Sequence, residues 1–452
     1  MTQLRPTAPV KAGGTRVLER ALLVIGVAAL GFNLRGAITS LPPVFPELQD
    51  SLRLSSATVS VLAATPVLCF AVFSGFAAWL SRRLGEERVL LGAIAALAAG
   101  LLLRGAAPGA LLFPGTVLAA AAIAIMNVLL SSLIKRRWPE RAGALIGLYI
   151  TALSIGAITG SVVSVPLWNS TGGSLALTLG WLAGPAALAA LLWLPQARYV
   201  TRPSPAAAAL PADRDTAAAA GEPAAAGASA AGSGSPAPSA AAAKSADSGR
   251  PGGPPAAPGR VAVHRHALAW HVTLFMGLQS LLYYAALSWL PTILRDRGAS
   301  ANTAGDLLAL MGVGNLAVSL LVPVVAQRMR GQRALVVPTV LAMALGLAGV
   351  VYLPLGSAVA WVLILGAGQN AALSLAIFFT MARAPHAVAA ASLSSLAQAG
   401  GYLLASAGPL EVGLLHSATG SWNAPVAVLF VLNGVLLVAG LLAARDRMLP
   451  AT

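Results

Sequence analysis

Arg35 is the residue whose chemistry stands out most in this sequence. It is an arginine inside the apolar stretch GFNLRGAITSLPP, residues 31–43. A guanidinium stays protonated at physiological pH and presents a planar fork of donors, which suits an anion with acceptor atoms. Thr39 follows Arg35 by one helical turn, and Gln279 precedes Tyr283 by the same spacing, so each pair shares a helix face. These residues predict a polar binding site inside apolar segments.

The segments that carry these residues have the composition of membrane spans. Of the 452 residues, 57% are hydrophobic and 10% are charged, and the mean hydropathy is +0.79. Soluble proteins have about 45–50% apolar and 25% charged residues. Because a bilayer core needs about 20 apolar residues per helix, we predict an all-α integral membrane protein with twelve transmembrane helices. The expected spans are 20–43, 56–80, 88–106, 110–133, 142–166, 174–194, 267–292, 303–326, 334–354, 358–381, 389–412 and 424–444.

The positive charge follows the pattern of a membrane orientation. The formal net charge is +15, with 29 Lys and Arg residues. If the amino terminus is inside, 24 of these lie in inner loops and tails, and the four in outer loops are Arg53, Arg104, Arg295 and Arg297. Such an asymmetry predicts that both termini are cytoplasmic. It also removes the reason to expect nucleic acid as a partner; the lipid bilayer is the partner we expect.

A central segment divides the spans into two groups of six. Residues 196–266 are rich in Ala, Pro, Ser and Gly without apolar periodicity, so we expect a disordered cytoplasmic linker. The predicted domains are then a tail at 1–19, a bundle at 20–195, a second bundle at 267–444 and a tail at 445–452. SLPPVF at 40–45 and WLPTIL at 289–294 end the first span of each group at the same register. Parallel six-helix repeats place a substrate site near the midplane between them.

The depth of Arg35 favours a role in binding. With a rise of 1.5 Å per residue and a span that enters near residue 20, Arg35 lies near the depth of such a site. An arginine there costs at least about 2.5–3.5 kcal/mol, so these residues usually face a wet cavity. No acidic residue lies deep in another span, which leaves substrate as the partner for its charge. The alternative is a structural arginine that reaches the outer surface or bonds to backbone carbonyls.

Further amides and phenols complete the candidate binding set. Tyr284 is the counterpart of Arg35 when the halves are aligned, and Gln398 with Tyr402 repeats the one-turn pairing of amide and phenol. This pairing offers donors and acceptors beside an aromatic face, which suits a small planar ligand. The remaining candidates, each well inside a span, are Asn33, Asn127, Gln369 and Asn370. All of these side chains are also suited to joining helices.

Gly156 and Gly160 form a Gly-x-x-x-Gly ridge in the fifth expected span. Small residues at this spacing usually allow two helices to pack closely. A gating role, in which the two groups of spans move against each other, is the alternative.

Several other classes of protein are disfavoured. An enzyme needs a nucleophile, a metal cluster or paired carboxylates within the spans, whereas here the acidic residues of spans are terminal. Glu411 falls at the outer end of its span, so we expect an interfacial carboxylate rather than a proton carrier. One cysteine, Cys69, forms no intramolecular disulfide, and the histidines show no metal-ligand spacing, so we predict no cofactor and no metal. A pump would need a G-x-x-x-x-G-K-[ST] loop, which is absent.

Longer stretches of the sequence resemble a known family. These are NLRGAITSLPPVFPEL, TPVLCFAVFSG, NVLLSSLIKRRWPERAGALIGLY, GLQSLLYYAALSWLPTIL, SLAQAGGYLLASAGPL and GLLHSATGSW. Together they resemble the cyanate porter and nitroimidazole transporter branch of the major facilitator superfamily, over nearly the whole chain outside the tails and linker. In the superfamily's loop after the second span, Arg83, Leu84 and Gly85 keep the usual pattern, whereas Arg82 replaces the usual acidic residue. The resemblance implies that Arg83 and Gly85 take part in packing or gating there.

The resemblance implies a secondary transporter in a bacterial inner membrane. Its expected substrate is a compact anion such as cyanate or nitrate, or a planar nitroimidazole-like compound. Because no deep carboxylate is present to carry a proton, uniport, antiport and proton entry with the substrate remain open, as does a coupled counter-ion. A monomer is expected. The alternatives are a multidrug-type efflux transporter of the same fold, a channel or a membrane-embedded enzyme.

Deletion of residues 203 to 259 tests whether the expected linker is only a tether. A flexible tether contributes reach rather than contacts, so we expect the shortened protein to insert and to transport at the wild-type rate. Loss of transport at a normal membrane level would show that the segment has a role of its own.

Overall fold

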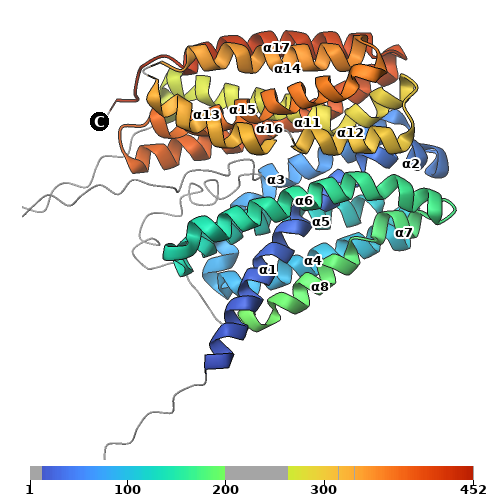
Figure 1. Ribbon diagram of the computed structural model, residues 1–452, viewed down its shortest axis with the longest axis vertical. Helices are drawn as coiled ribbons and strands as arrows, with labels where there is room; N and C mark the ends of the chain where they lie inside the picture. The colour runs from blue at the N-terminus through green and yellow to red at the C-terminus, as the bar shows by residue number, and fades with distance from the viewer. Residues whose placement is uncertain (1–12, 199–262, 314, 330, 451–452) are drawn as a thin grey trace, which may run out of the picture.

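The computed structural model describes residues 13–198, 263–313, 315–329 and 331–450. These residues form helices joined by short turns, and Figure 1 shows them gathered in two bundles. The amino-terminal bundle contains α1 (Gly13–Thr39), α2 (Phe45–Leu52), α3 (Ser56–Leu84), α4 (Glu86–Ala106), α5 (Pro108–Arg137), α6 (Ala142–Ser170), α7 (Leu175–Gly180) and α8 (Ala183–Trp193). The carboxy-terminal bundle contains α11 (Ala267–Asp296), α12 (Ala301–Val313), α13 (Asn315–Arg328), α14 (Arg333–Tyr352), α15 (Ala358–Ala382), α16 (Ala387–Thr419) and α17 (Asn423–Ala443).

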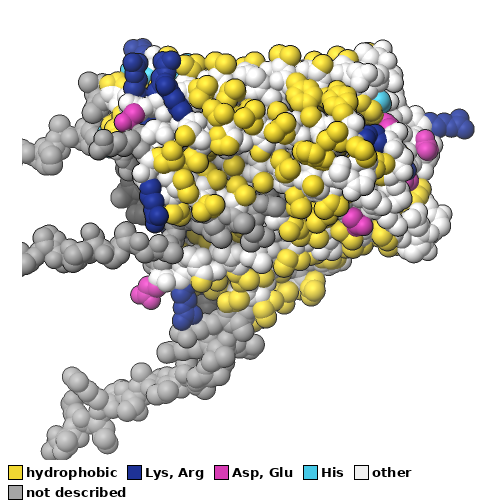
Figure 2. Space-filling view, turned by 45° about the horizontal axis from the view of Figure 1, so that its top comes forward, with side chains coloured by type: hydrophobic (Ala, Val, Ile, Leu, Met, Phe, Trp, Pro, Cys, Tyr) yellow, Lys and Arg dark blue, Asp and Glu magenta, His cyan; other side chains and the backbone are white. Residues whose placement is uncertain are grey.

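The described helices match the expected spans closely. Ten segments are long and apolar enough to cross a membrane. The other two expected spans correspond to α16 and to the pair α12 and α13, which lie on either side of residue 314. Figure 2 shows hydrophobic side chains over the flank of the molecule and charged side chains gathered toward its two ends, as a membrane-spanning body requires. The expected linker falls almost entirely on residues 199–262, outside the described residues.

Two boundaries differ from expectation. The first helix begins at Gly13 rather than near residue 20. The sixth span, expected as one helix at 174–194, is described as α7 and α8 with a break at Trp181 and Leu182. Pro185 accounts for this break, because it has no N–H to donate to the carbonyl of Trp181 and its ring would clash with that carbonyl.

The two halves repeat the same helix packing. In the first half α1 packs on α6, α4 on α5 and α4 on α8; in the second half α11 packs on α16, α14 on α15 and α14 on α17. The points where α1 crosses α6 and α11 crosses α16 also fall at equivalent positions in the two halves. A Cβ on Gly156 would overlap the carbonyl oxygen of Phe32, and a Cβ on Gly408 would lie 2.6 Å from that of Leu281. Phe32 and Leu281 each lie three residues before Arg35 and Tyr284, respectively, so the structure supports the expected equivalence of the latter two.

The halves meet along α3 with α16 and along α6 with α12 (Figure 1). At the end that carries α2, Arg295 Nη1 donates to both carboxylate oxygens of Glu47, at 2.7 and 2.8 Å. The rings of Phe45 and Trp289 lie 6.1 Å apart at the same end. These contacts close the molecule where α1 ends and α3 begins.

Candidate functional site

Arg35 lies where the two halves meet. Its guanidinium is half-buried and donates from Nη2 to the hydroxyl of Tyr283 in α11. The guanidinium carbon lies 5.2 Å from the centre of the Tyr283 ring, which is within range of a cation–π contact. Tyr283 and Tyr284 form an edge-to-face pair, with ring centres 5.1 Å apart. Among the residues that the structure describes, no carboxylate forms an ion pair with Arg35.

Two small cavities flank this guanidinium. The first has a volume of about 10 Å³, and its lining combines the polar residues Arg35, Asn127 and Tyr284 with the apolar residues Leu34, Ile38, Phe70 and Leu153. The second, of about 30 Å³, lies between α1, α6, α11 and α12, and its polar lining residues are Arg35, Thr39, Ser154, Ser161 and Tyr283. A water molecule needs roughly 10–15 Å³ of such volume. In this conformation the site therefore has room for a few waters or a very small solute.

Thr39 fixes the helix that carries Arg35. Its hydroxyl lies 2.9 Å from the carbonyl oxygen of Ala157 in α6 and 3.2 Å from that of Arg35 itself. A Cβ on Gly160 would lie 2.6 Å from the Thr39 hydroxyl. The two ridge glycines, Gly156 and Gly160, therefore allow α1 to approach α6 closely on both sides of Arg35, and a gating role for them stays a prediction.

The aromatic residues of the second half reach the site to different extents. Tyr284 lines the first cavity, whereas Tyr402 packs on Phe70 with ring centres 6.3 Å apart. Phe70 lines the first cavity and thus connects Tyr402 of α16 to the surroundings of Arg35. The structure therefore brings Arg35, Tyr283, Tyr284, Thr39 and Asn127 together and places Tyr402 behind them.

Four other expected binding residues are not among those that line the two cavities. The Asn33 amide donates to the carbonyls of Ala29 and Pro185, at 2.8 and 3.3 Å, on the side of α1 that faces α8. The amides of Gln279 and Gln398 donate to Ser280 and Ser394, at 2.6 and 3.0 Å. The Gln369 amide lies 3.5 Å from the carbonyl of Leu282. The structure does not place these four side chains in the lining of either cavity.

Several residues of the site were absent from the sequence prediction. Tyr149, Ser154 and Ser161 are on α6, and Phe70 is on α3. Ser154 and Ser161 are seven residues apart and therefore lie on one helix face, which is the signal that the sequence offered for them. Tyr149 had no such signal, because its partner Asn127 is on another helix.

Arg104, expected in an outer loop, is instead buried inside α4 with 2% of its surface exposed. Its guanidinium donates to the carbonyl of Leu179 at 2.9 and 3.1 Å and reaches that of Ala37 at 3.4 Å. It therefore caps the last turns of α7 and α1, where carbonyls lack intrahelical partners. Of the other three arginines expected in outer loops, Arg295 lies in the last turn of α11, whereas Arg53 and Arg297 directly follow the ends of α2 and α11.

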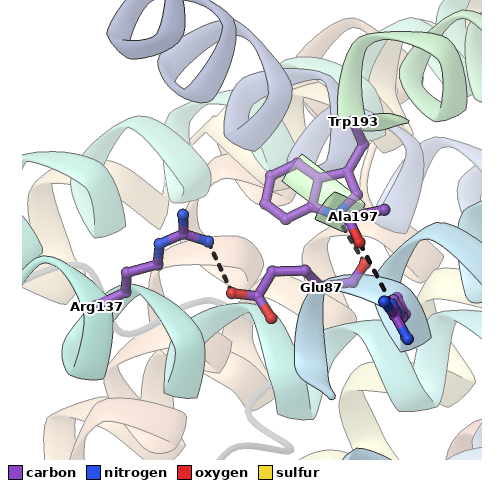
Figure 3. A network of polar contacts seen from close by, with 5 residues as sticks. Glu87, Arg137, Trp193 and Ala197 are labelled. Atoms are coloured by element: carbon purple, nitrogen blue, oxygen red, sulfur yellow. Dashed lines mark hydrogen bonds and ion pairs between the residues drawn. The ribbon is translucent and has the colours of Figure 1, made fainter. Parts of the chain in front are cut away.

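At the opposite end of the bundle, an ionic network joins α4, α5 and α8 (Figure 3). Glu87 is fully buried and accepts from Arg137 Nη1 at 2.7 Å, while its carbonyl accepts from the indole of Trp193 at 3.1 Å. Arg136 forms a second ion pair with Glu86. This pairing accounts for the buried carboxylates of the first half, and Glu411 of the second half is exposed.

Arg83 and Gly85, expected in the loop after the second span, were expected to take part in packing or gating; the structure places Arg83 in the last turn of α3. Gly85 adopts a φ of 84°, a conformation that glycine tolerates best, and is the N-cap residue of α4. The guanidinium carbon of Arg83 lies 4.5 Å from the centre of the Trp79 ring on its own helix. The structure thus shows a turn residue and a local stacking contact, and a gating role for them stays a prediction.

Comparison with known proteins identifies similar chains. Residues 22–409 match the sequence model of the Major Facilitator Superfamily. The chain is 36% identical to the uncharacterized transporter YycB of Bacillus subtilis (strain 168), over 94% of each chain. It is 32% identical to the 2-nitroimidazole transporter of Escherichia coli (strain K12), over 95% of this chain and 97% of the relative. The cyanate transport protein CynX of the same organism is 26% identical, over 88% and 91%.

A solved structure shares the fold. The bacterial homologue of the human lysosomal transporter Spinster, in an inward-facing and occupied conformation, superposes with a TM-score of 0.67 and 14% identity, covering 96% of this chain and 99% of that one. At this identity the likeness concerns the fold alone.

Proposed function

Because this chain belongs to the Major Facilitator Superfamily, in the branch of the cyanate and 2-nitroimidazole transporters, we propose that it moves a compact anion or a small planar nitroimidazole-like compound past Arg35 by alternating access. The coarser conclusion follows from the family itself. The chain is a multi-pass membrane transporter of a small solute and not an enzyme.

The observation that carries the proposal is the unpaired charge of Arg35 at the junction of the halves. Its hydrogen-bonding partner is a neutral phenol, and no described carboxylate forms an ion pair with it. A charge at this depth is costly unless it meets an opposite charge. A substrate anion would supply that charge, and the small cavities on both sides of the guanidinium favour a compact one.

Uptake into proteoliposomes tests this function directly. We expect the purified protein to exchange internal unlabelled nitrate or cyanate for external labelled anion, and 2-nitroimidazole serves as the neutral probe. A carrier shows accelerated exchange under these conditions, whereas a channel only equilibrates the two sides. Absence of exchange with all three probes, at normal reconstitution, would contradict the proposed substrate class.

The described carboxylates favour particular modes of coupling. Glu86 and Glu87 are buried but paired with arginines at one end of the bundle, and Glu411 is exposed. None of these three lines the cavities beside Arg35. We therefore propose uniport, anion exchange or entry of the proton with the substrate, rather than a dedicated proton-carrying carboxylate at the centre.

The distribution of Lys and Arg residues supports an orientation with both termini inside. The contacts at the end that carries α2 support a state that is closed on the outer side. With both termini in the cytoplasm of a bacterial inner membrane, the end that carries α2 faces outward. The ion pair of Glu47 and Arg295 and the contact of Phe45 with Trp289 then close the outer side. In this proposal the halves rock apart at these contacts to admit substrate from outside, and the protein works as a monomer.

Substitution of the outer ion pair tests this gate. Partly exposed pairs contribute about 0.2–1 kcal/mol, so we expect Glu47→Gln to raise outward opening by about 1.4- to 5-fold. The reporter is a cysteine at Ser154, which lines the second cavity, in a Cys69→Ser background. Its labelling by a membrane-impermeant thiol reagent added outside is measured in intact cells.

The control for the gate is the exchanged pair Glu47→Arg with Arg295→Glu. It keeps the attraction and reverses its polarity, so labelling is expected to return toward the wild-type rate. If the single and exchanged variants label equally, the ion pair does not hold the outer side closed.

A further inference from the structure

Tyr149 is a buried tyrosine with 3% of its surface exposed, on α6 one turn before Leu153. Leu153 lines both cavities beside Arg35. The Tyr149 hydroxyl lies 3.0 Å from Oδ1 of Asn127, and that pair joins α6 to α5. The contact thus lies directly behind the lining of the first cavity.

This contact determines which end of the Asn127 amide faces the cavity. A carboxamide has one end that only accepts and one end that only donates, and a phenol hydroxyl can meet either end. In the structure the Tyr149 hydroxyl donates to Oδ1. When the Tyr149 hydroxyl donates to Oδ1, the amide NH2 group is the end left for the cavity that Asn127 lines. With the reverse orientation the carbonyl oxygen would face Arg35 and compete with any anion for its charge.

With this orientation the polar lining of the first cavity is rich in donors. Arg35 has donors and no acceptor, Asn127 presents its NH2 group, and Tyr284 adds a hydroxyl. The rest of the lining is apolar, and hydrogen bonds to a charge are stronger in such surroundings. Such a lining matches a solute that has acceptor atoms and a negative charge.

We propose that Tyr149 is a positioning residue that makes the site selective for anions by holding the Asn127 amide with its NH2 group toward Arg35. The inference rests on the proposed function and deepens it, because it assigns the discrimination between an anion and a neutral heterocycle to one hydroxyl. Asn127 contacts the substrate, and Tyr149 acts through Asn127.

The surroundings of Tyr149 allow its hydroxyl to be tested apart from its ring. The ring and backbone pack on α1, since a Cβ on Gly31 would lie 3.1 Å from Tyr149 Cδ2 and 2.8 Å from its carbonyl oxygen. Tyr149→Phe keeps these contacts and removes the hydrogen bond to Asn127. Tyr352→Phe, at an exposed tyrosine of α14, is the matched control for loss of a hydroxyl.

The experiment compares two probes on each variant, nitrate and 2-nitroimidazole, at a mildly acidic pH that keeps the heterocycle neutral. Dissociation constants come from ligand-induced thermal stabilisation of the purified protein. One neutral hydrogen bond contributes about 1 kcal/mol, so we expect Tyr149→Phe to raise the dissociation constant of nitrate about fivefold. Binding of 2-nitroimidazole is expected to stay equal or to improve, because a freed Asn127 carbonyl accepts from the ring N–H. Tyr352→Phe should change neither.

A second variant tests the orientation of the Asn127 amide by changing Asn127 itself. Asn127→Asp can still accept from Tyr149 through one oxygen, but its other oxygen then faces Arg35. We expect this carboxylate to compete with nitrate and to raise its dissociation constant by more than tenfold, while the protein remains folded. Unchanged nitrate binding in Asn127→Asp would contradict the placement of Asn127 beside the bound anion.

The remaining outcomes separate this inference from the proposed function. If wild type responds to nitrate and Tyr149→Phe keeps the same ratio of the two dissociation constants, the role of Tyr149 in selectivity is wrong and the proposed function stands. Equal weakening of both probes would show that Tyr149 only supports packing. If wild type responds to neither probe, the proposed substrate class is wrong, and the inference is overturned with it.

Discussion

Replacement of Arg35 by glutamine is expected to abolish the stabilisation of this transporter by its anion without unfolding the protein. A hydrogen bond to a charged group contributes about 1.5–3 kcal/mol, so the anion should bind about 10- to 100-fold more weakly. The unliganded variant should melt at the wild-type temperature or above it. Arg35 is half-buried and has no described ion-pair partner. Removal of its charge therefore relieves a desolvation cost that offsets the lost contacts with Tyr283.

Thermal unfolding in detergent measures both effects, with cyanate, nitrate, small carboxylates and nitroimidazoles as probes. A ligand at 100 times its dissociation constant stabilises the folded state by about 2.7 kcal/mol, which is easily detected. Arg53→Gln removes an exposed charge from the same half and serves as the control. If a neutral heterocycle stabilises wild type and Arg35→Gln equally, Arg35 is a structural or gating residue and not the substrate anchor.

Replacement of Gly156 by alanine is expected to be the most damaging change outside the binding residues. The added Cβ would overlap the carbonyl oxygen of Phe32, and backbone cannot turn away as a side chain does. Overpacking of this kind costs about 1–3 kcal/mol or more, which corresponds to a fall in melting temperature of roughly 5 °C. Because α1 would move away from α6, Arg35 would also lose its alignment with Tyr283, and transport should fall strongly.

Gly147 provides the matched control for this substitution. It lies on the same helix, and a Cβ there would meet no atom within 4 Å. Gly147→Ala should be neutral or stabilise the protein by up to about 1 kcal/mol through helix propensity. Equal melting temperatures for Gly147→Ala and Gly156→Ala would show that the close approach of α1 and α6 does not limit the fold.

Local sequence was sufficient to predict where most helices lie. The spans expected at 334–354, 358–381 and 424–444 correspond to helices Arg333–Tyr352, Ala358–Ala382 and Asn423–Ala443. Each of these segments is apolar along its whole length, and backbone groups in a bilayer must be satisfied within the segment. Hydrophobicity and length therefore determine the helix without reference to its neighbours.

The expectations that failed depended on neighbours in space. Arg104 was counted with the outer loops because it lies at the end of an apolar run, but α1 and α7 supply carbonyls that draw it inside. The contacts of Asn33 also depend on neighbours in space, because its amide donates to the carbonyl of Pro185 in α8, and its role in binding stays a prediction. Sequence spacing gives the face of a helix, but it does not say which other helix lies against that face.

The sequence by itself determined the family, through its resemblance to known transporters, and the plan of twelve spans. The spans depend on hydrophobicity and their expected orientation on charge asymmetry, which are local properties. The importance of Arg35 for transport stays a prediction. The tertiary structure alone decided that Tyr283, which lies 248 residues away, bonds to Arg35, and that the Tyr149 hydroxyl donates to Asn127. Those pairings arise where helices from distant parts of the chain cross, and glycines such as Gly156 set how closely they approach.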